Sequence, residues 1–247
     1  MLAGKNAVIT GTNRGIGKAI LEKFAENGCN IWACARCQDP SFEDLLNGLA
    51  QKYHVWMKPV YFDLSSEDSI KAGFKQIYQE RKPIDILVNN AGIGHAALFQ
   101  MTPLKTAREV FEMDFFAVFG LTQLVLKVMS RQKSGNIINI ASIAGLDGSP
   151  MDCTYGAAKA ALISFTRSLA AETGGNGIRV NAIAPGPTET EMTNMYGDEV
   201  KEQLRARNQL GRFAKPEEIA EIALFLASPK SSFINGQIIR ADGGKKQ

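Results

Sequence analysis

Short apolar segments recur along the 247-residue chain and alternate with longer amphipathic segments. Each short segment is apolar at consecutive positions, whereas a strand with one face in water alternates apolar and polar residues. Continuous apolar runs are typical of parallel strands that are covered on both faces. The pattern therefore predicts seven buried strands, at residues 7–10, 30–35, 55–62, 84–89, 136–141, 179–183 and 237–240.

Helical periodicity fills the intervals between these predicted strands. The predicted helices cover residues 16–27, 41–52, 66–81, 104–131, 153–173 and 215–228. Strands that alternate with helices indicate βαβ units and a parallel sheet. Because no Pro- or Ser-rich linker and no repeat divides the sequence, we expect residues 1–247 to form a single α/β domain. Its fold would be a doubly wound sheet of about seven strands with helices on both faces.

One predicted helix has more apolar surface than a single core contact requires. Residues 111–129 are apolar nearly all the way round, whereas a surface helix needs one apolar stripe. One side can pack on the sheet, and the other needs a second cover. We expect a second copy of the chain to supply it, which predicts a homo-oligomer, either a dimer or a tetramer; the alternative is a helix buried deeply within one chain.

The composition is that of an ordinary soluble protein, with 45% hydrophobic and 21% charged residues. The net charge of +3 includes no Lys/Arg run, so no nucleic-acid partner is expected, and no uncharged apolar run approaches the ~20 residues of a membrane span. Cys34 and Cys37 form a CxxC without a second ligand pair. We therefore expect reduced structural thiols, no metal site and a cytoplasmic location.

A glycine-rich segment follows the first predicted strand and opens the first predicted helix. It reads Thr10-Gly11-Thr12-Asn13-Arg14-Gly15-Ile16-Gly17. Glycines let the backbone turn tightly and approach a pyrophosphate, and a helix N-terminus offers free N–H groups with a positive dipole end. The position between a strand and a helix therefore predicts a dinucleotide-binding turn.

A tyrosine and a lysine, Tyr155 and Lys159, lie four residues apart in the helix predicted over 153–173, and Ser142 precedes it. Positions i and i+4 share one helix face, so the phenol and the ammonium point the same way. A phenol has a pKa near ~10, which a neighbouring ammonium lowers because it favours the phenolate. The pair is predicted to move a proton at neutral pH. The structural alternatives are a strand-end cap, a packing aromatic and a solvated lysine.

The motifs have a characteristic combination. The spacing Gly11-x-x-x-Gly15-x-Gly17 differs from the ordinary Gly-x-Gly-x-x-Gly fingerprint. With Asn89-Asn90-Ala91-Gly92, Ser142, Tyr155-x-x-x-Lys159 and Pro185-Gly186, the chain resembles the short-chain dehydrogenase/reductase family over essentially its whole length. Residues 236–244 are also similar to the ending of bacterial 3-oxoacyl-[acyl-carrier-protein] reductases. The resemblance implies a Rossmann fold.

The resemblance also implies roles for three residues in the chemistry. Tyr155 would give a proton to a carbonyl oxygen during reduction, or take one from an alcohol during oxidation. Lys159 would lower the pKa of Tyr155 and hold the cofactor ribose, and Ser142 would hydrogen-bond the developing oxyanion. The hydride would come from the cofactor, so no metal is required.

Further segments match the family's cofactor contacts. Asp63 and Leu64 lie where the family contacts adenine, although Asp63 is equally placed to cap a helix. Residues 185–192 resemble the segment that holds the nicotinamide amide, or form a turn followed by a mobile loop. The expected cofactor-binding set comprises Gly11, Asn13, Arg14, Gly15, Ile16, Gly17, Arg36, Asp63, Leu64, Asn90, Ala91, Gly92, Tyr155, Lys159, Pro185, Gly186, Thr188 and Thr190.

The segment after the second strand predicts the choice of cofactor. NAD-preferring folds place an acidic residue there for the ribose hydroxyls, whereas a basic residue suits a 2′-phosphate. Here the chain reads Cys34-Ala35-Arg36, with no carboxylate before Asp39. We expect Arg36 and Arg14 to clamp a 2′-phosphate, which predicts NADP(H); the alternative is two solvated surface arginines.

Asp114 departs from the resemblance. It stands where the family usually has an Asn that supports a proton relay toward the lysine. A carboxylate near Lys159 would partly cancel the pull of the lysine on the pKa of Tyr155, or would accept bonds from water and ammonium and preserve the relay. We expect Asp114 to take part in catalysis in a working enzyme with an altered pH optimum.

The substrate is less well defined by the sequence. Lys127, Arg131 and Lys133 are candidates for a basic patch beside the cleft that would dock an acidic carrier protein, but residues 170–172 read Ala-Ala-Glu where carrier-protein reductases often have an arginine. His95 either lines the cleft or is exposed.

We expect reduction of a carbonyl, best exemplified by 3-oxoacyl-acyl-carrier-protein to its 3-hydroxy product. The alternatives are another small ketone, a sugar or a polyol, and, in a different class, a catalytically silent NADP-binding sensor or scaffold.

Overall fold

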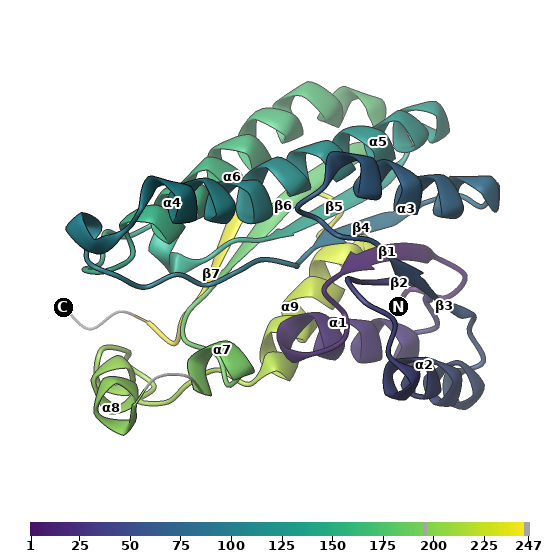
Figure 1. Cartoon of the computed structure of the whole chain (residues 1–247). Helices are drawn as coiled ribbons and strands as arrows, with labels where there is room; N and C mark the ends of the chain where they lie inside the picture. The colour runs from purple at the N-terminus through teal and green to yellow at the C-terminus, as the bar shows by residue number, and fades with distance from the viewer. Residues whose placement is uncertain (195–196, 245–247) are drawn as a thin grey trace.

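The computed structural model describes residues 1–194 and 197–244, drawn in colour in Figure 1. Within them lies a seven-stranded parallel sheet in the order β3-β2-β1-β4-β5-β6-β7. The doubly wound fold is thereby confirmed, as are all seven predicted strands, with small shifts at their ends. The strands are β1 (Asn6–Thr10), β2 (Asn30–Ala35), β3 (Met57–Tyr61), β4 (Ile86–Asn89), β5 (Gly135–Ile140), β6 (Ile178–Pro185) and β7 (Ile238–Ala241).

Helices cover both faces of the sheet. In Figure 1, α3, α4, α5 and α6 lie on one face and α1, α2 and α9 on the other, while α7 and α8 lie beyond the end of β6. The helices are α1 (Gly15–Glu26), α2 (Pro40–Tyr53), α3 (Glu67–Gln79), α4 (Leu104–Phe111), α5 (Ala117–Gln132), α6 (Cys153–Thr173), α7 (Glu191–Asn194), α8 (Asp198–Ala206) and α9 (Pro216–Ala227). The short helices α7 and α8 were not predicted.

The two faces of the sheet form two separate hydrophobic cores. Consecutive residues of a strand point to opposite faces. Ile9 therefore joins the core beneath α1 and α9, together with Phe24, whereas its neighbour Val8 joins the core beneath α3 and α5, together with Leu121. This arrangement explains why the strands are apolar at every position.

The helix predicted over residues 104–131 is interrupted, which corrects the expectation of one continuous helix. A π-helical turn, η2 (Glu112–Phe116), separates α4 from α5. Such turns are rare in helices and are frequently found at functional sites. Apolar periodicity does not reveal the turn, because the residues on both sides of it remain helical. Its buried member is Asp114.

The apolar helix α5 has one covered and one uncovered face in a single chain. Leu121, Val125 and Met129 are fully buried against the sheet, whereas Phe116 and Phe119 are 53% and 44% exposed. The stretch Leu104–Gln132 is long and apolar enough to cross a membrane by length and composition alone, a test that core helices of soluble proteins also pass. Its contacts with the sheet identify it as a core helix, and the deeply buried alternative does not hold for its outer face.

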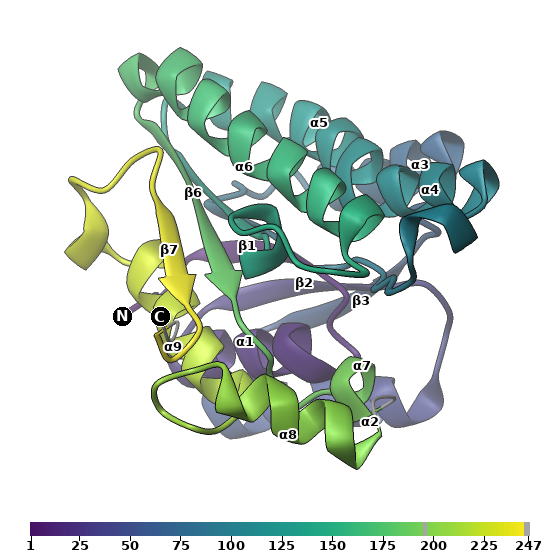
Figure 2. The same ribbon diagram turned by 90° about the vertical axis from the view of Figure 1, so that its left-hand side faces the viewer.

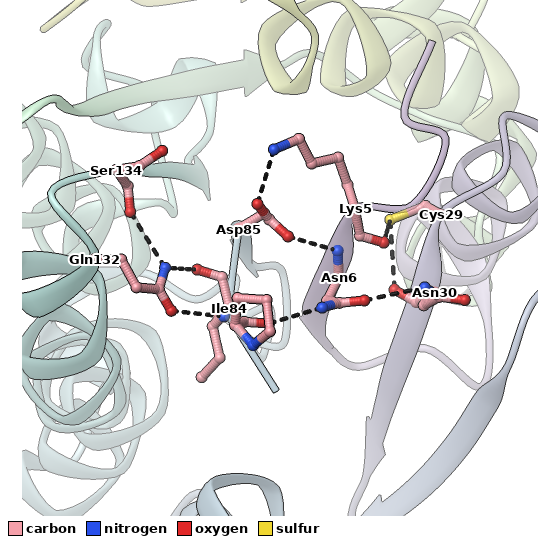
Figure 3. A network of polar contacts seen from close by, with 9 residues as sticks. Lys5, Asn6, Cys29, Asn30, Ile84, Asp85, Gln132 and Ser134 are labelled. Atoms are coloured by element: carbon pink, nitrogen blue, oxygen red, sulfur yellow. Dashed lines mark hydrogen bonds and ion pairs between the residues drawn. The ribbon is translucent and has the colours of Figure 1, made fainter. Parts of the chain in front are cut away.

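A polar network lies where the parallel strands begin, which we call the amino-terminal edge of the sheet (Figure 3). The Lys5 ammonium lies 2.9 Å from the Asp85 carboxylate, whose other oxygen accepts a hydrogen bond from the Asn6 backbone N–H. The Asn30 side chain donates to the Asn6 side chain at 3.0 Å. Gln132, at the end of α5, bonds both backbone groups of Ile84. These contacts attach the starts of β1, β2 and β4 to one another.

Candidate active site

The glycine-rich turn lies at the carboxyl end of β1, where the order of strands reverses between β1 and β4. Ligands of open α/β sheets bind in the crevice at such a switch point. Gly11 and Gly15 have positive φ angles, of 69° and 53°. At Gly17 a Cβ atom would lie 2.0 Å from the carbonyl oxygen of Gly11, so only glycine fits there. The turn therefore brings its backbone directly against the start of α1.

The first turn of α1 has no side-chain cap, in contrast to the next two helices. Asp39 accepts a bond from the Ser41 N–H at the start of α2, and Ser66 does the same for Ser69 in α3. The residue before α1, Arg14, makes no such bond. The N–H groups of α1 are thus available to an anion, which fits the pyrophosphate of a dinucleotide. In the same turn, Asn13 is exposed and Ile16 packs half-buried on the core.

The segment after β4 holds the glycine turn in place. The Asn90 side chain donates to the carbonyl oxygens of Thr10 and Gly11 at 3.0 and 3.1 Å. The Thr10 hydroxyl in turn accepts from the backbone N–H groups of Asn90 and Ala91. Asn90 therefore has a structural task in addition to its position in the crevice. This role of Thr10 was not predicted from the sequence. A hydroxyl residue at the end of a strand, next to the glycines, could have indicated it.

Tyr155 and Lys159 lie together in the first two turns of α6, as predicted. The Lys159 ammonium is 5.7 Å from the centre of the Tyr155 ring. Ser142 follows β5 and begins a short 3₁₀ turn, η3 (Ile143–Gly145), where its hydroxyl accepts the Ala144 N–H at 3.1 Å. The cap that was the structural alternative for Ser142 is thus present. The same hydroxyl still lies beside Tyr155, where it opposes part of the rise in the pKa of Tyr155 that burial causes.

Asp114 reaches this cluster from the π-helical turn. Its side chain is fully buried, and one carboxylate oxygen lies 3.1 Å from the ammonium of Lys159, a residue that is 4% exposed. Lys159 also donates to the carbonyl oxygen of Ile140 at 3.1 Å. A Cβ atom at Gly92 would lie 2.1 Å from the Asp114 carboxylate, so glycine there makes room for the acid. The expected proximity of Asp114 and Lys159 is confirmed.

Burial and mutual contacts set the titration of the three groups. Burial raises the pKa of Tyr155, Lys159 opposes this, and the Asp114 carboxylate raises the pKa further, so that it lies above its usual value. Burial lowers the pKa of Lys159, but Asp114 and Tyr155 together outweigh burial and the net pKa is raised. Burial also raises the pKa of Asp114 against the pull of Lys159. The Asp114 carboxylate therefore opposes the effect of Lys159 on the pKa of Tyr155.

A buried network of amide and hydroxyl side chains connects the strands and helices around the site. Asn89 donates to the Asn139 side chain at 2.8 Å and to the Thr122 hydroxyl at 3.0 Å. Asn139 donates to the Thr166 hydroxyl at 2.9 Å. These residues connect β4 and β5 to α5 and α6 in a region without exposed surface. This network is not predictable from the sequence, because single polar residues in strands form no pattern.

The residues expected to hold the adenosine half lie at the ends of β2 and β3. Arg36 is exposed directly after β2. Asp63 accepts hydrogen bonds from the Ser65 N–H and hydroxyl, and these bonds, with a smaller contribution from Arg36, lower its pKa. Asp63 therefore caps a turn, while α3 itself is capped by Ser66. Leu64 is half-buried against the core.

The loop after β6 lies against the glycine turn. Pro185 is the last residue of β6, and the Thr188 hydroxyl donates to the Gly186 carbonyl at 3.0 Å. A Cβ atom at Gly15 would lie 3.3 Å from a methyl group of Thr190. Arg14 pairs with Glu191 at the start of α7, a contact that the sequence does not predict. Arg14 is thus engaged by a carboxylate, whereas Arg36 makes no such ion pair within the described residues.

Two further expectations are modified. Lys127, Arg131 and Lys133 are exposed at the far end of α5, and the adjacent Gln132 binds Ile84 at the amino-terminal edge of the sheet. A helix of this length spans about 24 Å. Within one chain, the basic patch is therefore not beside the cleft. His95 is half-buried rather than exposed, and its place in the substrate cleft stays a prediction.

The cysteines are free thiols, with Cys34 buried and Cys37 exposed. Burial raises the pKa of the Cys34 thiol. Within residues 1–194 and 197–244 no cluster of three or more His, Cys, Asp or Glu side chains is arranged to hold a metal ion.

A glycine-lined turn at the switch point of a doubly wound sheet, next to a Ser–Tyr–Lys cluster, defines the class of dinucleotide-dependent oxidoreductases. A family model described as "Enoyl-(Acyl carrier protein) reductase" matches residues 11–246. The chain belongs to the short-chain dehydrogenase/reductase family and is an oxidoreductase that uses a nicotinamide cofactor.

Several relatives match along nearly their full length. The chain is 40% identical to the 3-oxoacyl-[acyl-carrier-protein] reductase FabG of Aquifex aeolicus, with 98% of each chain covered. It is 36% identical to a 3alpha-hydroxysteroid dehydrogenase of Mediterraneibacter gnavus, with 100% of this chain and 98% of that one covered. The crystal structure of a 3-oxoacyl-[acyl-carrier protein] reductase from Brucella melitensis superposes with a TM-score of 0.89 at 31% identity, covering 100% of this chain and 92% of the other.

Proposed function

We propose that the enzyme is an NADP(H)-dependent carbonyl reductase that converts a 3-oxoacyl thioester on acyl carrier protein to its 3-hydroxy product. The observation that carries the reaction type is the position of the Lys159 ammonium over the Tyr155 ring at the carboxyl edge of the sheet. The 40% identity with the Aquifex aeolicus reductase over 98% of both chains supports the substrate.

In the proposed reaction the protein supplies the proton and polarises the carbonyl. Tyr155 donates its phenolic proton to the carbonyl oxygen as reduction proceeds, and Ser142 donates a hydrogen bond to the same oxygen while charge develops on it. Lys159 stabilises the resulting phenolate, and its carbonyl contact at Ile140 fixes the ammonium in place. A bound reduced nicotinamide supplies the hydride.

The proposed cofactor is NADP(H), and the turn around Gly11, Gly15 and Gly17 fits its pyrophosphate. Arg36 is the proposed partner of the 2′-phosphate, because its guanidinium is exposed and forked donors suit phosphate. Asp39, the first carboxylate after β2, accepts the Ser41 N–H as the cap of α2. We expect a clearly higher kcat/KM with NADPH than with NADH. Equal efficiency with both would refute the proposal.

Exposed apolar side chains favour an apolar substrate over a sugar or polyol. They belong to three segments that meet: Ala97 donates to the carbonyl of Met151, and a Cβ atom at Gly94 would touch the Met192 side chain at 2.8 Å. Leu98, Phe99 and Met101 are 51%, 76% and 71% exposed in the first of these segments. An acyl chain fits such surroundings, and so does a steroid, the substrate class named for the Mediterraneibacter gnavus relative.

The decisive test is NADPH oxidation with a short 3-oxoacyl thioester, with a steroid ketone and a keto-sugar in parallel. We expect turnover of the thioester, and a loss in kcat of about 10²–10⁴ in Tyr155→Phe with cofactor binding retained. Turnover only of another carbonyl would identify that compound class instead. Tight NADPH binding without turnover of any carbonyl would indicate a sensor or scaffold.

We further propose a cytoplasmic homo-oligomer, either a dimer or a tetramer. Its contact would be the outer face of α5 and α6, where Phe115, Phe116, Phe119 and Phe165 form one aromatic cluster. The exposed part of this cluster is an apolar patch that a second copy would cover. Light scattering is expected to give a particle mass that is a multiple of the 26.9 kDa chain mass. Phe119→Glu is expected to reduce this particle mass.

A further inference from the structure

An arginine outside the reacting cluster connects two segments of the site. Arg240, in β7, binds both oxygens of Asp147 through its two terminal nitrogens, at 3.2 and 2.7 Å. Its Nε donates to Asp242 at 2.7 Å. All five N–H donors of a guanidinium lie in one plane, so a single arginine can hold two carboxylates in fixed relative positions. A lysine in the same place would not reproduce this geometry.

Asp147 belongs to the segment that carries Ser142. Its backbone N–H donates to the Ile143 carbonyl at 2.8 Å, and the Gly145 N–H donates to the Ser142 carbonyl at 3.1 Å, so residues 142–147 form one hydrogen-bonded unit. On one side this unit presses on α6, where a Cβ atom at Gly145 would lie 2.7 Å from the backbone nitrogen of Ala160. Arg240 holds its other end.

Asp242 belongs to a turn that packs against the loop after β6, and Figure 2 shows β6 and β7 side by side. The side chain of Asp242 is only 8% exposed, and it accepts the Gly244 N–H at 3.0 Å. A Cβ atom at Gly186 would lie 2.7 Å from the Cβ atom of Asp242. The Gly186 N–H also donates to the Ala241 carbonyl. The turn therefore fixes the position of the first residues of the loop after Pro185.

We propose that Arg240 is a positioning residue that links the segment carrying Ser142 to the turn beside Gly186, and so fixes the Ser142 hydroxyl relative to the nicotinamide-binding loop. This role rests on the proposed function of both segments. In this role Arg240 acts through Asp147 and Asp242, the two carboxylates that it holds. Its effect is expected on the geometry of the oxyanion donor, because a misplacement of about 1 Å can cost about 10²-fold in rate.

The test uses the full-length protein, with hydrogen exchange of residues 142–147 in the cofactor-free protein and steady-state kinetics as two separate readouts. We expect Arg240→Met to speed exchange in this segment and to lower kcat about 10- to 100-fold, with the KM for NADPH changed less than about twofold. Arg240→Lys keeps the charge but loses the fork, so intermediate values of both readouts are expected.

The matched control is Lys58→Met, which removes an ion pair of 2.7 Å with Glu80 that links β3 to the end of α3. It is expected to leave exchange in residues 142–147 and kcat unchanged. Unchanged exchange or an unchanged kcat in Arg240→Met would overturn the proposal. If exchange rises throughout the molecule in Arg240→Met, the variant is misfolded and the same two criteria apply to Arg240→Lys. Absence of turnover in the parent enzyme would contradict the proposed function, while the exchange readout still tests the link.

Discussion

Two lysine–aspartate pairs lie at opposite edges of the same sheet. Lys5 and Asp85, drawn in Figure 3, are 2.9 Å apart at the amino-terminal edge. Their side chains are 50% and 18% exposed. Lys159 and Asp114 are 3.1 Å apart at the carboxyl edge, where the corresponding values are 5% and 0%. The two pairs therefore have the same chemistry and nearly the same geometry, and differ in their access to water.

This difference separates a structural contact from one that we propose serves catalysis. Water screens the pair at the amino-terminal edge, so each charge depends little on its partner, and exposed pairs contribute about 0–1 kcal/mol. In the buried pair the loss of solvation is large, and each group depends on the other for its protonation state. The same burial that makes the Lys159–Asp114 pair costly also lets it act on Tyr155. The proposed tuning of Tyr155 by Lys159 therefore depends on burial, whereas the attachment of two strands by Lys5 does not.

The largest effect is expected from Lys159→Met. It removes the cation from the phenol, so kcat is expected to fall about 10²–10⁴-fold. It also leaves Asp114 buried without its partner, which is expected to lower the free energy of unfolding at pH 7 by about 3–5 kcal/mol. Burial raises the pKa of Asp114, so the carboxyl becomes neutral as the pH falls, and the stability difference from the parent should shrink. Urea titrations at several pH values measure this trend.

The double variant Lys159→Met/Asp114→Asn is the control for this prediction. It removes both charges, so stability is expected to recover while activity stays low. A stability loss that persists in the double variant, or that does not depend on pH, would mean that packing of the lysine side chain dominates over its charge.

A smaller effect is expected from Asp114→Asn, which keeps the shape of the side chain and removes its charge. The Asp114 carboxylate adds to the rise in the pKa of Tyr155 that burial causes, so its removal should lower that pKa. It should lower the pKa of Lys159 as well, because burial then acts unopposed by the acid. The pKa values of Tyr155 and Lys159 are thus both expected to fall.

The pH–rate profiles measure this shift in both reaction directions. Oxidation needs the phenolate, so its rise should begin at lower pH in Asp114→Asn. Reduction needs the phenol, so its decline should also begin at lower pH. At neutral pH kcat for oxidation is expected to increase severalfold relative to kcat for reduction, while the ratio of the two kcat/KM values stays fixed by the equilibrium constant. Superimposable profiles of variant and parent would show that Asp114 does not act on Tyr155 through its charge.

The sequence predicted those parts of the site that follow from local pattern. The i, i+4 spacing placed Tyr155 and Lys159 on one face of α6, and glycines between a strand and a helix predicted the turn at the switch point. The strands followed from apolar runs, because burial on both faces leaves a direct mark on composition.

Features that depend on contacts between distant segments were not predicted. The Arg240–Asp147 contact joins residues 93 positions apart, and the Arg14–Glu191 contact joins residues 177 positions apart. The sequence alone does not show which end of α5 lies near the cleft. It therefore did not reveal that Lys127, Arg131 and Lys133 lie at the other end. The π-helical turn at Asp114 was hidden for a related reason, since its neighbours on both sides keep helical periodicity.

The smallest effect is expected from Lys5→Met at the amino-terminal edge. Asp85 keeps its hydrogen bond from the Asn6 backbone N–H and remains accessible to water, so it is not left as an isolated buried charge. The free energy of unfolding should fall by about 0.2–1 kcal/mol, and less in high salt, because exposed charges are screened. Since the pair lies across the sheet from Tyr155, kcat should match that of the parent. A loss approaching that of Lys159→Met would mean that burial is not what distinguishes the two pairs.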